Sequence, residues 1–225
     1  MKIHSHHLLP FLIATSAFAQ AAPDAGLAAA VTELQSGWDR AQYQITDKDA
    51  KTKAFEALEA KADAAITTYP QSAELKIWDG IIYSSQAGVE GGMGALPMVK
   101  KAKSLFEAAL AINPNAMNGG AHTSLGSLYY KVPGWPIAFG DNSEAKKHLQ
   151  AALKISPNDI DANYFYGDYL VQQKEYAEAL TVLEKAMQAP ARAGREIADQ
   201  GRRKEIEADM TLAQNEIHAD SASRN

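Results

Sequence analysis

Apolar residues recur along most of this chain at spacings of three or four, separated by polar residues, which is the pattern of an amphipathic helix. The first stretch begins at Leu27 and continues to Ile45, where a run of polar residues interrupts it. The pattern resumes at Phe55 and ends at Tyr69-Pro70, because proline lacks a backbone N–H group and restricts the residue before it. This part of the chain therefore predicts two helices joined by a short turn.

The helical pattern then repeats with small residues at fixed places. In each later unit, a first stretch carries a glycine followed three positions on by tyrosine or leucine, at Gly80 and Tyr83, Gly126 and Tyr129, and Gly167 and Leu170. A second stretch carries two alanines around a large apolar residue, and a proline follows: Ala102, Phe106, Ala109 and Pro114; Ala145, Leu149, Ala152 and Pro157; Ala179, Leu183, Ala186 and Pro190. Small residues let two helix axes approach, and the large residue fills the groove between them. Three units in register predict stacked helical hairpins.

This arrangement resembles the tetratricopeptide repeat (TPR), a helical hairpin with a period of about 34 residues. Ala145 and Ala152 recur 34 residues later as Ala179 and Ala186. We therefore expect an all-α fold, a right-handed α-solenoid of about four TPR-like helical hairpins plus a C-terminal capping helix. The expected repeat domain covers residues 20–190, the first unit being degenerate. The expected capping helix covers residues 191–218, and a frayed tail covers residues 219–225.

Residues after Pro190 place many charges among a few apolar positions, as expected of a cap with a polar outer face. The run Arg202-Arg203-Lys204 has two interpretations, a solvated surface of the cap or a patch for an anionic partner. Glu205 and Glu207 lie next to the run and partly neutralise it, which favours the solvated surface.

The N-terminus has the pattern of a secretory leader, with Lys2, an apolar run from Leu8 to Phe18 and small residues after it. Ala17-Phe18-Ala19 fits the small-x-small rule of signal peptidase and predicts a signal peptide over residues 1–19. The apolar run is shorter than the roughly 20 residues of a spanning helix. We expect a periplasmic protein without stable membrane insertion after leader removal. A disordered apolar N-terminus and a retained membrane anchor are the alternatives.

Two units are longer than the repeat period, because the prolines that end successive units are 44, 43 and 33 residues apart. The excess is predicted to form loops between paired helices at residues 87–97 and 131–141, on the same edge of adjacent hairpins. The first is rich in glycine, which permits mobility or close backbone approach. The second holds Trp135, Ile137 and Phe139, which either pack over helix ends or face a partner, and packing is the favoured interpretation.

The concave face of such a stack collects the polar side of each first helix. The tentative binding residues on this face and in the second loop are Thr123, Ser127, Tyr130, Lys131, Trp135, Ile137, Phe139, Tyr164, Asp168 and Gln172. This mixture suits hydrogen bonding to a peptide or a small polar ligand. It lacks the Lys/Asn/Arg arrangement with which some TPR domains clamp a C-terminal carboxylate.

Composition and motifs restrict the chemistry. The net charge is −5, which argues against a nucleic-acid partner, and the absence of cysteine excludes disulfides and thiolate sites. His122 and His148 do not have the spacing of a metal site and are interpreted as structural or surface residues. No grouping points to a catalytic site. We therefore predict no catalytic residue, no metal and no cofactor, and we do not expect an enzyme.

Residues 70–212 resemble a group of bacterial periplasmic TPR proteins, the T-component (TatT) of TPR-associated TRAP transporters. The resemblance rests on the leader, the lengthened turns and the run VPGWPIAFGDNSEAKKHL. It implies a helical repeat subunit that contacts a solute-binding protein and passes on a hydrophobic ligand. TatT-like proteins are typically lipoproteins, and this chain has no cysteine to lipidate.

Two functional hypotheses follow. The leading one is a periplasmic scaffold that binds a protein or peptide partner through its concave face and loops, because three repeats in register accompany two matched insertions. The alternative is a TatT-like accessory carrier of a small apolar ligand for a transport system.

Overall fold

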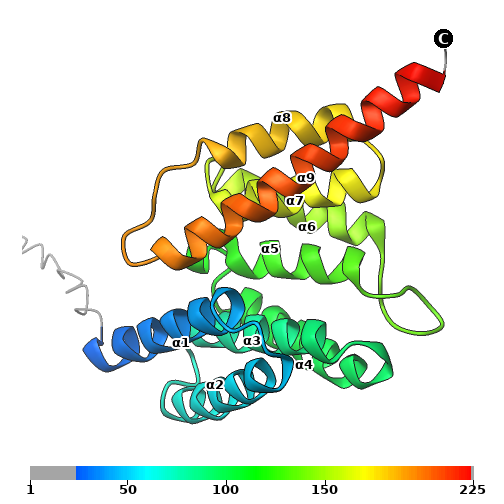
Figure 1. Ribbon diagram of the computed structural model, residues 1–225. Helices are drawn as coiled ribbons and strands as arrows, with labels where there is room; N and C mark the ends of the chain where they lie inside the picture. Colours follow the sequence, from blue (N-terminus) through cyan, green and yellow to red (C-terminus); the bar gives the residue numbers. More distant parts are fainter. Residues whose placement is uncertain (1–23, 224–225) are drawn as a thin grey trace, which may run out of the picture.

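The computed structural model describes residues 24–223, which form helices joined by turns and loops (Figure 1). The helices are α1 (Ala25–Tyr43), α2 (Lys48–Thr68), α3 (Ala73–Glu90), α4 (Ala95–Ile112), α5 (Ala116–Lys131), α6 (Asn142–Ile155), α7 (Ile160–Gln172), α8 (Tyr176–Met187) and α9 (Glu196–Ser223), with a short 3₁₀ turn, η1 (Gly92–Gly94), before α4. The signal peptide predicted over residues 1–19 lies outside the described residues.

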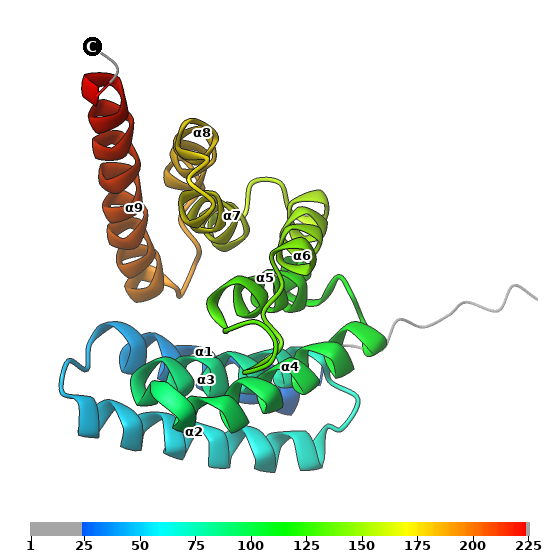
Figure 2. The same ribbon diagram turned by 90° about the vertical axis from the view of Figure 1, so that its right-hand side faces the viewer.

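Four antiparallel hairpins, α1–α2, α3–α4, α5–α6 and α7–α8, stack in chain order, and α9 packs on the last (Figure 1). Each first helix contacts the first helix of the next hairpin, whereas α2, α4, α6 and α8 lie on the outer side (Figure 2). The expected all-α solenoid of TPR-like hairpins is confirmed.

The repeated glycines lie where the two helices of a hairpin touch. A Cβ atom on each glycine would lie far inside van der Waals distance of the large residue on the second helix: Gly80 at 2.5 Å from Phe106, Gly126 at 2.6 Å from Leu149 and Gly167 at 2.5 Å from Leu183. Those three large residues are fully buried. The small-residue pattern in the sequence therefore reports real helix crossings.

The two insertions are accommodated differently. The loop expected at residues 87–97 is mostly helical, because α3 continues to Glu90 and α4 begins at Ala95, with only η1 and a glycine between them. This expectation was wrong in detail: the additional residues lengthen both helices. The second insertion does form a loop over residues 132–141, and Asp141 caps α6 by accepting hydrogen bonds from the backbone N–H groups of Ser143 and Glu144.

The C-terminal helix also differs from its expected bounds. Residues 191–195 form a turn that leads into α9, and α9 continues to Ser223, through most of the tail that we expected to be frayed. This length allows one end of α9 to pack on α8 while the other reaches α1.

One position in the second hairpin departs from the apolar pattern. Asp79 immediately precedes Gly80, and the next two hairpins carry buried Leu125 and Tyr166 at the same position. Asp79 is also fully buried, and both its carboxylate oxygens lack a hydrogen-bond partner among the described residues. Burial, and then the negative charge of Asp63 on α2, raises the pKa of Asp79 from 3.8 to about 7. The charged form of this residue therefore destabilises the packing of α2 against α3.

We expect Asp79→Asn to raise the free energy of unfolding by about 2–4 kcal/mol at pH 8, because one pKa unit corresponds to about 1.4 kcal/mol. The folded pKa lies above the unfolded value, so the wild type gains stability as the pH falls from about 7 to about 4, and the variant gains less. Urea unfolding followed by circular dichroism at pH 8 and pH 4 measures both effects. Glu207→Gln, on the exposed side of α9, is the control; an Asp79→Asn variant that is less stable than wild type at pH 8 contradicts this account.

Candidate ligand-binding cavity

The N-terminal half of α9 packs against α1 and closes the concave side of the solenoid into a ring. Gly201 lies directly against the Tyr43 ring, since a Cβ atom there would be 2.2 Å from it. The Tyr43 hydroxyl donates to Glu205 Oε2 at 3.3 Å, and Arg195 Nη2 lies 3.0 Å from Asp39 Oδ1. Five helices, α1, α3, α5, α7 and α9, thus surround one space.

This space, the concave cavity, has a volume of about 510 Å³. All four hairpins contribute to its aromatic and apolar lining, mostly from their first helices. These residues are Trp38, Tyr43, Trp78, Ile81, Phe106 (on α4), Met117, Leu128, Tyr164 and Phe165. Its polar lining includes Gln35, Gln42, Ser84, Ser85, Thr123, Ser124, Ser127, Lys131, Asp161, Arg192, Arg195, Arg202 and Glu205. The cavity is therefore amphipathic.

One wall of the cavity is built on two tryptophans. The Trp38 and Trp78 rings lie 6.0 Å apart between centroids, and the Tyr43 ring meets Trp38 edge-on at 5.7 Å. Trp38 Nε1 donates to Ser85 Oγ at 2.8 Å, which fixes the indole of α1 against α3. Ring contacts of this kind hold the wall in one arrangement.

An ionic network lies beside these rings, with the Arg195 guanidinium 5.3 Å from the Trp78 ring centroid. Asp161, in the first turn of α7, accepts hydrogen bonds from Arg192 Nη1 and from Arg202 Nε, both at 2.7 Å, and Arg192 also donates to Asp199. Burial disfavours the charged form of Asp161, but the adjacent guanidinium groups of Arg202 and Arg192 outweigh it and hold the pKa below the ordinary value of 3.8. Asp161 therefore stays ionised and joins α9 to α7.

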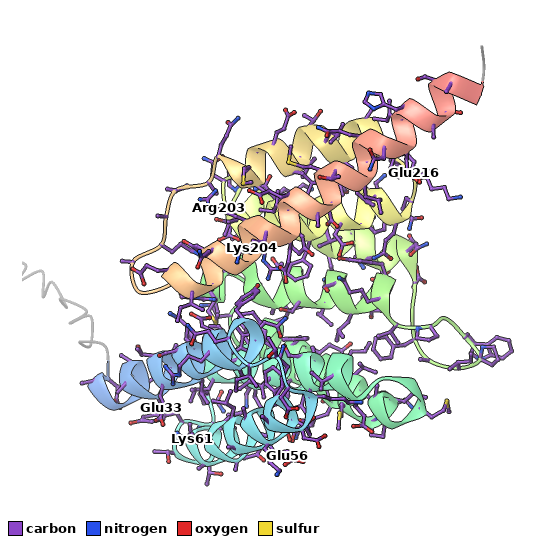
Figure 3. All side chains as sticks on the ribbon, in the orientation of Figure 1. Glu33, Glu56, Lys61, Arg203, Lys204 and Glu216 are labelled. Atoms are coloured by element: carbon purple, nitrogen blue, oxygen red, sulfur yellow. The ribbon has the colours of Figure 1, made fainter. Side chains whose placement is uncertain are left out.

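The arginines of the Arg202-Arg203-Lys204 run form neither a solvated surface nor a free basic patch for an anionic partner. Arg202 is buried, with its guanidinium 4.3 Å from the Tyr164 ring centroid. Arg203 donates to the backbone carbonyls of Met187 and Ala189 at the end of α8. Only Lys204 is exposed (Figure 3). The solvated-surface interpretation was wrong for the arginines, because each makes a specific bond to a neighbouring helix.

Four of the ten predicted binding residues line the concave cavity: Thr123, Ser127, Lys131 and Tyr164. Three more form a polar cluster beside it. Asp168 accepts hydrogen bonds from Tyr130 at 2.8 Å and from Gln172 at 3.2 Å, and Lys131 Nζ lies 2.6 Å from the same carboxylate. This cluster connects α5 to α7.

The remaining three predicted residues lie on the 132–141 loop, away from the cavity lining. Trp135 is 90% exposed and Ile137 56% exposed, whereas Phe139 packs edge-on against Tyr129 with 5.8 Å between ring centroids. The loop thus holds one packed and two outward-facing apolar side chains.

Sequence reasoning missed the cavity residues of α1 and of the turn before α9, chiefly Trp38, Tyr43, Arg192 and Arg195. Their contacts join residues far apart in the sequence, such as Arg195 and Asp39, which are separated by 156 positions. A periodic pattern within one helix cannot predict a contact of this kind. The one available signal was the concentration of arginine after Pro190, where five of the six arginines of the chain lie.

The start of α5 also shapes the cavity. Met117, Asn118 and Gly119 have positive φ angles of 48°, 56° and 80°, so the chain turns left-handed before the regular helix. Met117 and Asn118 line the cavity as a result. Such backbone conformations are unfavourable for residues other than glycine and persist only where the surrounding packing enforces them.

Within residues 24–223, no three His, Asp or Glu side chains are grouped closely enough to hold a metal ion. His122 and His148 form a pair, with their Nδ1 atoms 2.9 Å apart, and burial lowers the pKa of both. Over the same residues, no helix has the length and apolar character needed to cross a membrane.

Residues 137–196 match the tetratricopeptide repeat family. The match covers part of the second loop, then α6, α7 and α8, and ends at the start of α9. This chain therefore contains TPR sequence, and repeats of this kind commonly mediate protein–protein interaction. No curated protein matches the chain.

We expect Asp161→Asn to lower the free energy of unfolding by about 3 kcal/mol, because it leaves Arg192 and Arg202 without their shared carboxylate. The wild type loses the same contribution as the pH falls below about 4, since the folded pKa of Asp161 is depressed. Hydrogen exchange of α9 amides at pH 7 locates the effect, and Lys204→Ala is the exposed control. Unchanged protection of α9 in Asp161→Asn contradicts this role.

Proposed function

We propose that this protein is a non-catalytic periplasmic binding protein that carries a small amphipathic ligand in the concave cavity. The observation that carries the proposal is the ring closure by α9, which leaves a space of about 510 Å³. Small-molecule sites typically measure about 300–1,000 Å³ and combine apolar walls with a few polar groups. The TatT-like run VPGWPIAFGDNSEAKKHL supports a carrier for a transport system.

The lining of the cavity suggests how a ligand is held. The apolar part of the ligand fits between Trp38, Trp78 and Phe165, where burial of apolar surface provides the affinity. Hydroxyl groups of Ser124 and Ser127 on α5 are available to orient a polar part. The charged groups at the α9 end are paired with one another, so they close the ring.

Ser127→Phe places a ring in the cavity and is expected to abolish ligand retention. Native mass spectrometry of protein purified from the periplasm measures the co-purifying mass. Ser104→Phe, on the exposed side of α4, is the matched control and is expected to retain the ligand. A wild-type protein that carries no small molecule, or a Ser127→Phe variant that retains one, counts against the carrier function.

The second candidate is a scaffold for a protein partner, which the TPR match of residues 137–196 favours. Lys131 and Gln172 are exposed beside the cavity and offer a polar rim to a peptide. If a partner binds there, Lys131→Ala and Gln172→Ala are expected to reduce its recovery in a periplasmic pulldown several-fold, and Lys154→Ala, on exposed α6 surface, is expected to leave recovery unchanged. Equal recovery with all three variants rejects this rim as the interface.

A further inference from the structure

Three of the large apolar side chains exposed on the described residues lie on the turns of two adjacent hairpins. Met93, between α3 and α4, is 74% exposed, and Trp135 and Ile137 follow on the 132–141 loop. Both turns lie on the right-hand side of Figure 1 and face the viewer in Figure 2. We call these three side chains the apolar edge.

The loop that carries Trp135 is held by its own backbone hydrogen bonds. Gly140 N–H donates to Pro133 O at 2.9 Å, and Ile137 N–H donates to Gly134 O at 3.1 Å. A side chain at position 140 would meet backbone atoms, since a Cβ there would lie 1.9 Å from Val132 O. The loop is therefore a defined structure, and the outward position of its tip follows from that structure.

The loop is also fixed to the body of the protein. Phe139 packs against Tyr129, and Lys103 Nζ on α4 lies 5.8 Å from the Phe139 ring centroid. Phe139 is thus packed while Trp135 and Ile137 project from the same loop. Large apolar groups held away from all internal packing mark a surface for interaction.

The charge around the apolar edge is opposite to that of the chain. Segments 90–103 and 131–147 contain six lysines and three carboxylates, whereas the whole chain has a net charge of −5. Lys100 is exposed and lies one turn from Lys103, on the side of α4 that faces the loop. The two segments beside the apolar edge therefore have a net positive charge, although Lys103, Lys131 and Lys147 are each paired with a carboxylate.

We propose that the apolar edge docks on the surface of an anionic lipid bilayer. Tryptophan favours the boundary between headgroups and acyl chains, and an anionic membrane attracts lysines near its surface. The three side chains are separate tips on two turns and are not part of the concave cavity lining. A fluid bilayer accepts separate tips, whereas a protein partner needs a pocket for each. This docking does not depend on the ligand site.

The test uses the whole protein with vesicles whose acyl chains carry bromine, which quenches tryptophan only at the bilayer. The chain has three tryptophans, and Trp38 and Trp78 are buried, so quenching reports Trp135. With vesicles that contain 30% phosphatidylglycerol, we expect quenching that Trp135→Phe abolishes. Vesicles of phosphatidylcholine alone are expected to bind at least tenfold more weakly.

Variants of the edge and matched controls decide the outcome. Ile137→Ser and Lys100→Gln are expected to reduce partitioning to anionic vesicles several-fold. Leu212→Ser and Lys204→Gln, exposed residues of α9, are expected to leave it unchanged. The proposal is overturned if bromolipid quenches no tryptophan, if Ile137→Ser and Leu212→Ser behave alike, or if the edge variants lose a protein partner while vesicles are not bound.

Discussion

The arrangement of this protein depends on one carboxylate. Asp161 begins α7 and is shared by Arg192 and Arg202, which lie before and within α9. Two arginines on one carboxylate fix both the position and the direction of α9 across the concave face. With α9 in that place, Gly201 meets Tyr43 and the solenoid becomes a ring. Without α9 in that place, the same hairpins would form the open groove that is usual for stacked repeats.

Ring closure brings aromatic rings and charged groups together around one cavity. The first two hairpins contribute the indoles of Trp38 and Trp78, and the last hairpin and α9 contribute paired charges. Because those charges are paired with one another, the aromatic surface is left for contacts with a ligand. The arrangement suits selection by shape and apolar surface more than by charge.

The sequence predicted the hairpins well and the site only in part. Glycine, alanine and leucine at fixed places report helix crossings, because close approach at Gly80, Gly126 and Gly167 is a local steric requirement. The same repeat logic located Ser127 and Lys131 on the concave face. It did not predict that α9 returns to α1, since that depends on ion pairs between residues far apart in sequence. It also placed the first insertion in a loop, although residues such as Ala87 and Ala95 continue a helix readily.

The buried charge at Asp79 has a consequence for cooperativity. Stacked repeats unfold as one unit only while each interface between neighbours is strong. Asp79 weakens the interface between the first two hairpins and does so most when it is ionised. In an open solenoid, fraying of the first hairpin would leave the rest of the stack intact. Here α1 also contacts α9, so fraying of α1 removes contacts that hold α9 in place. Helices α1 and α9 therefore belong to one unit of local unfolding, and the concave cavity opens whenever that unit does.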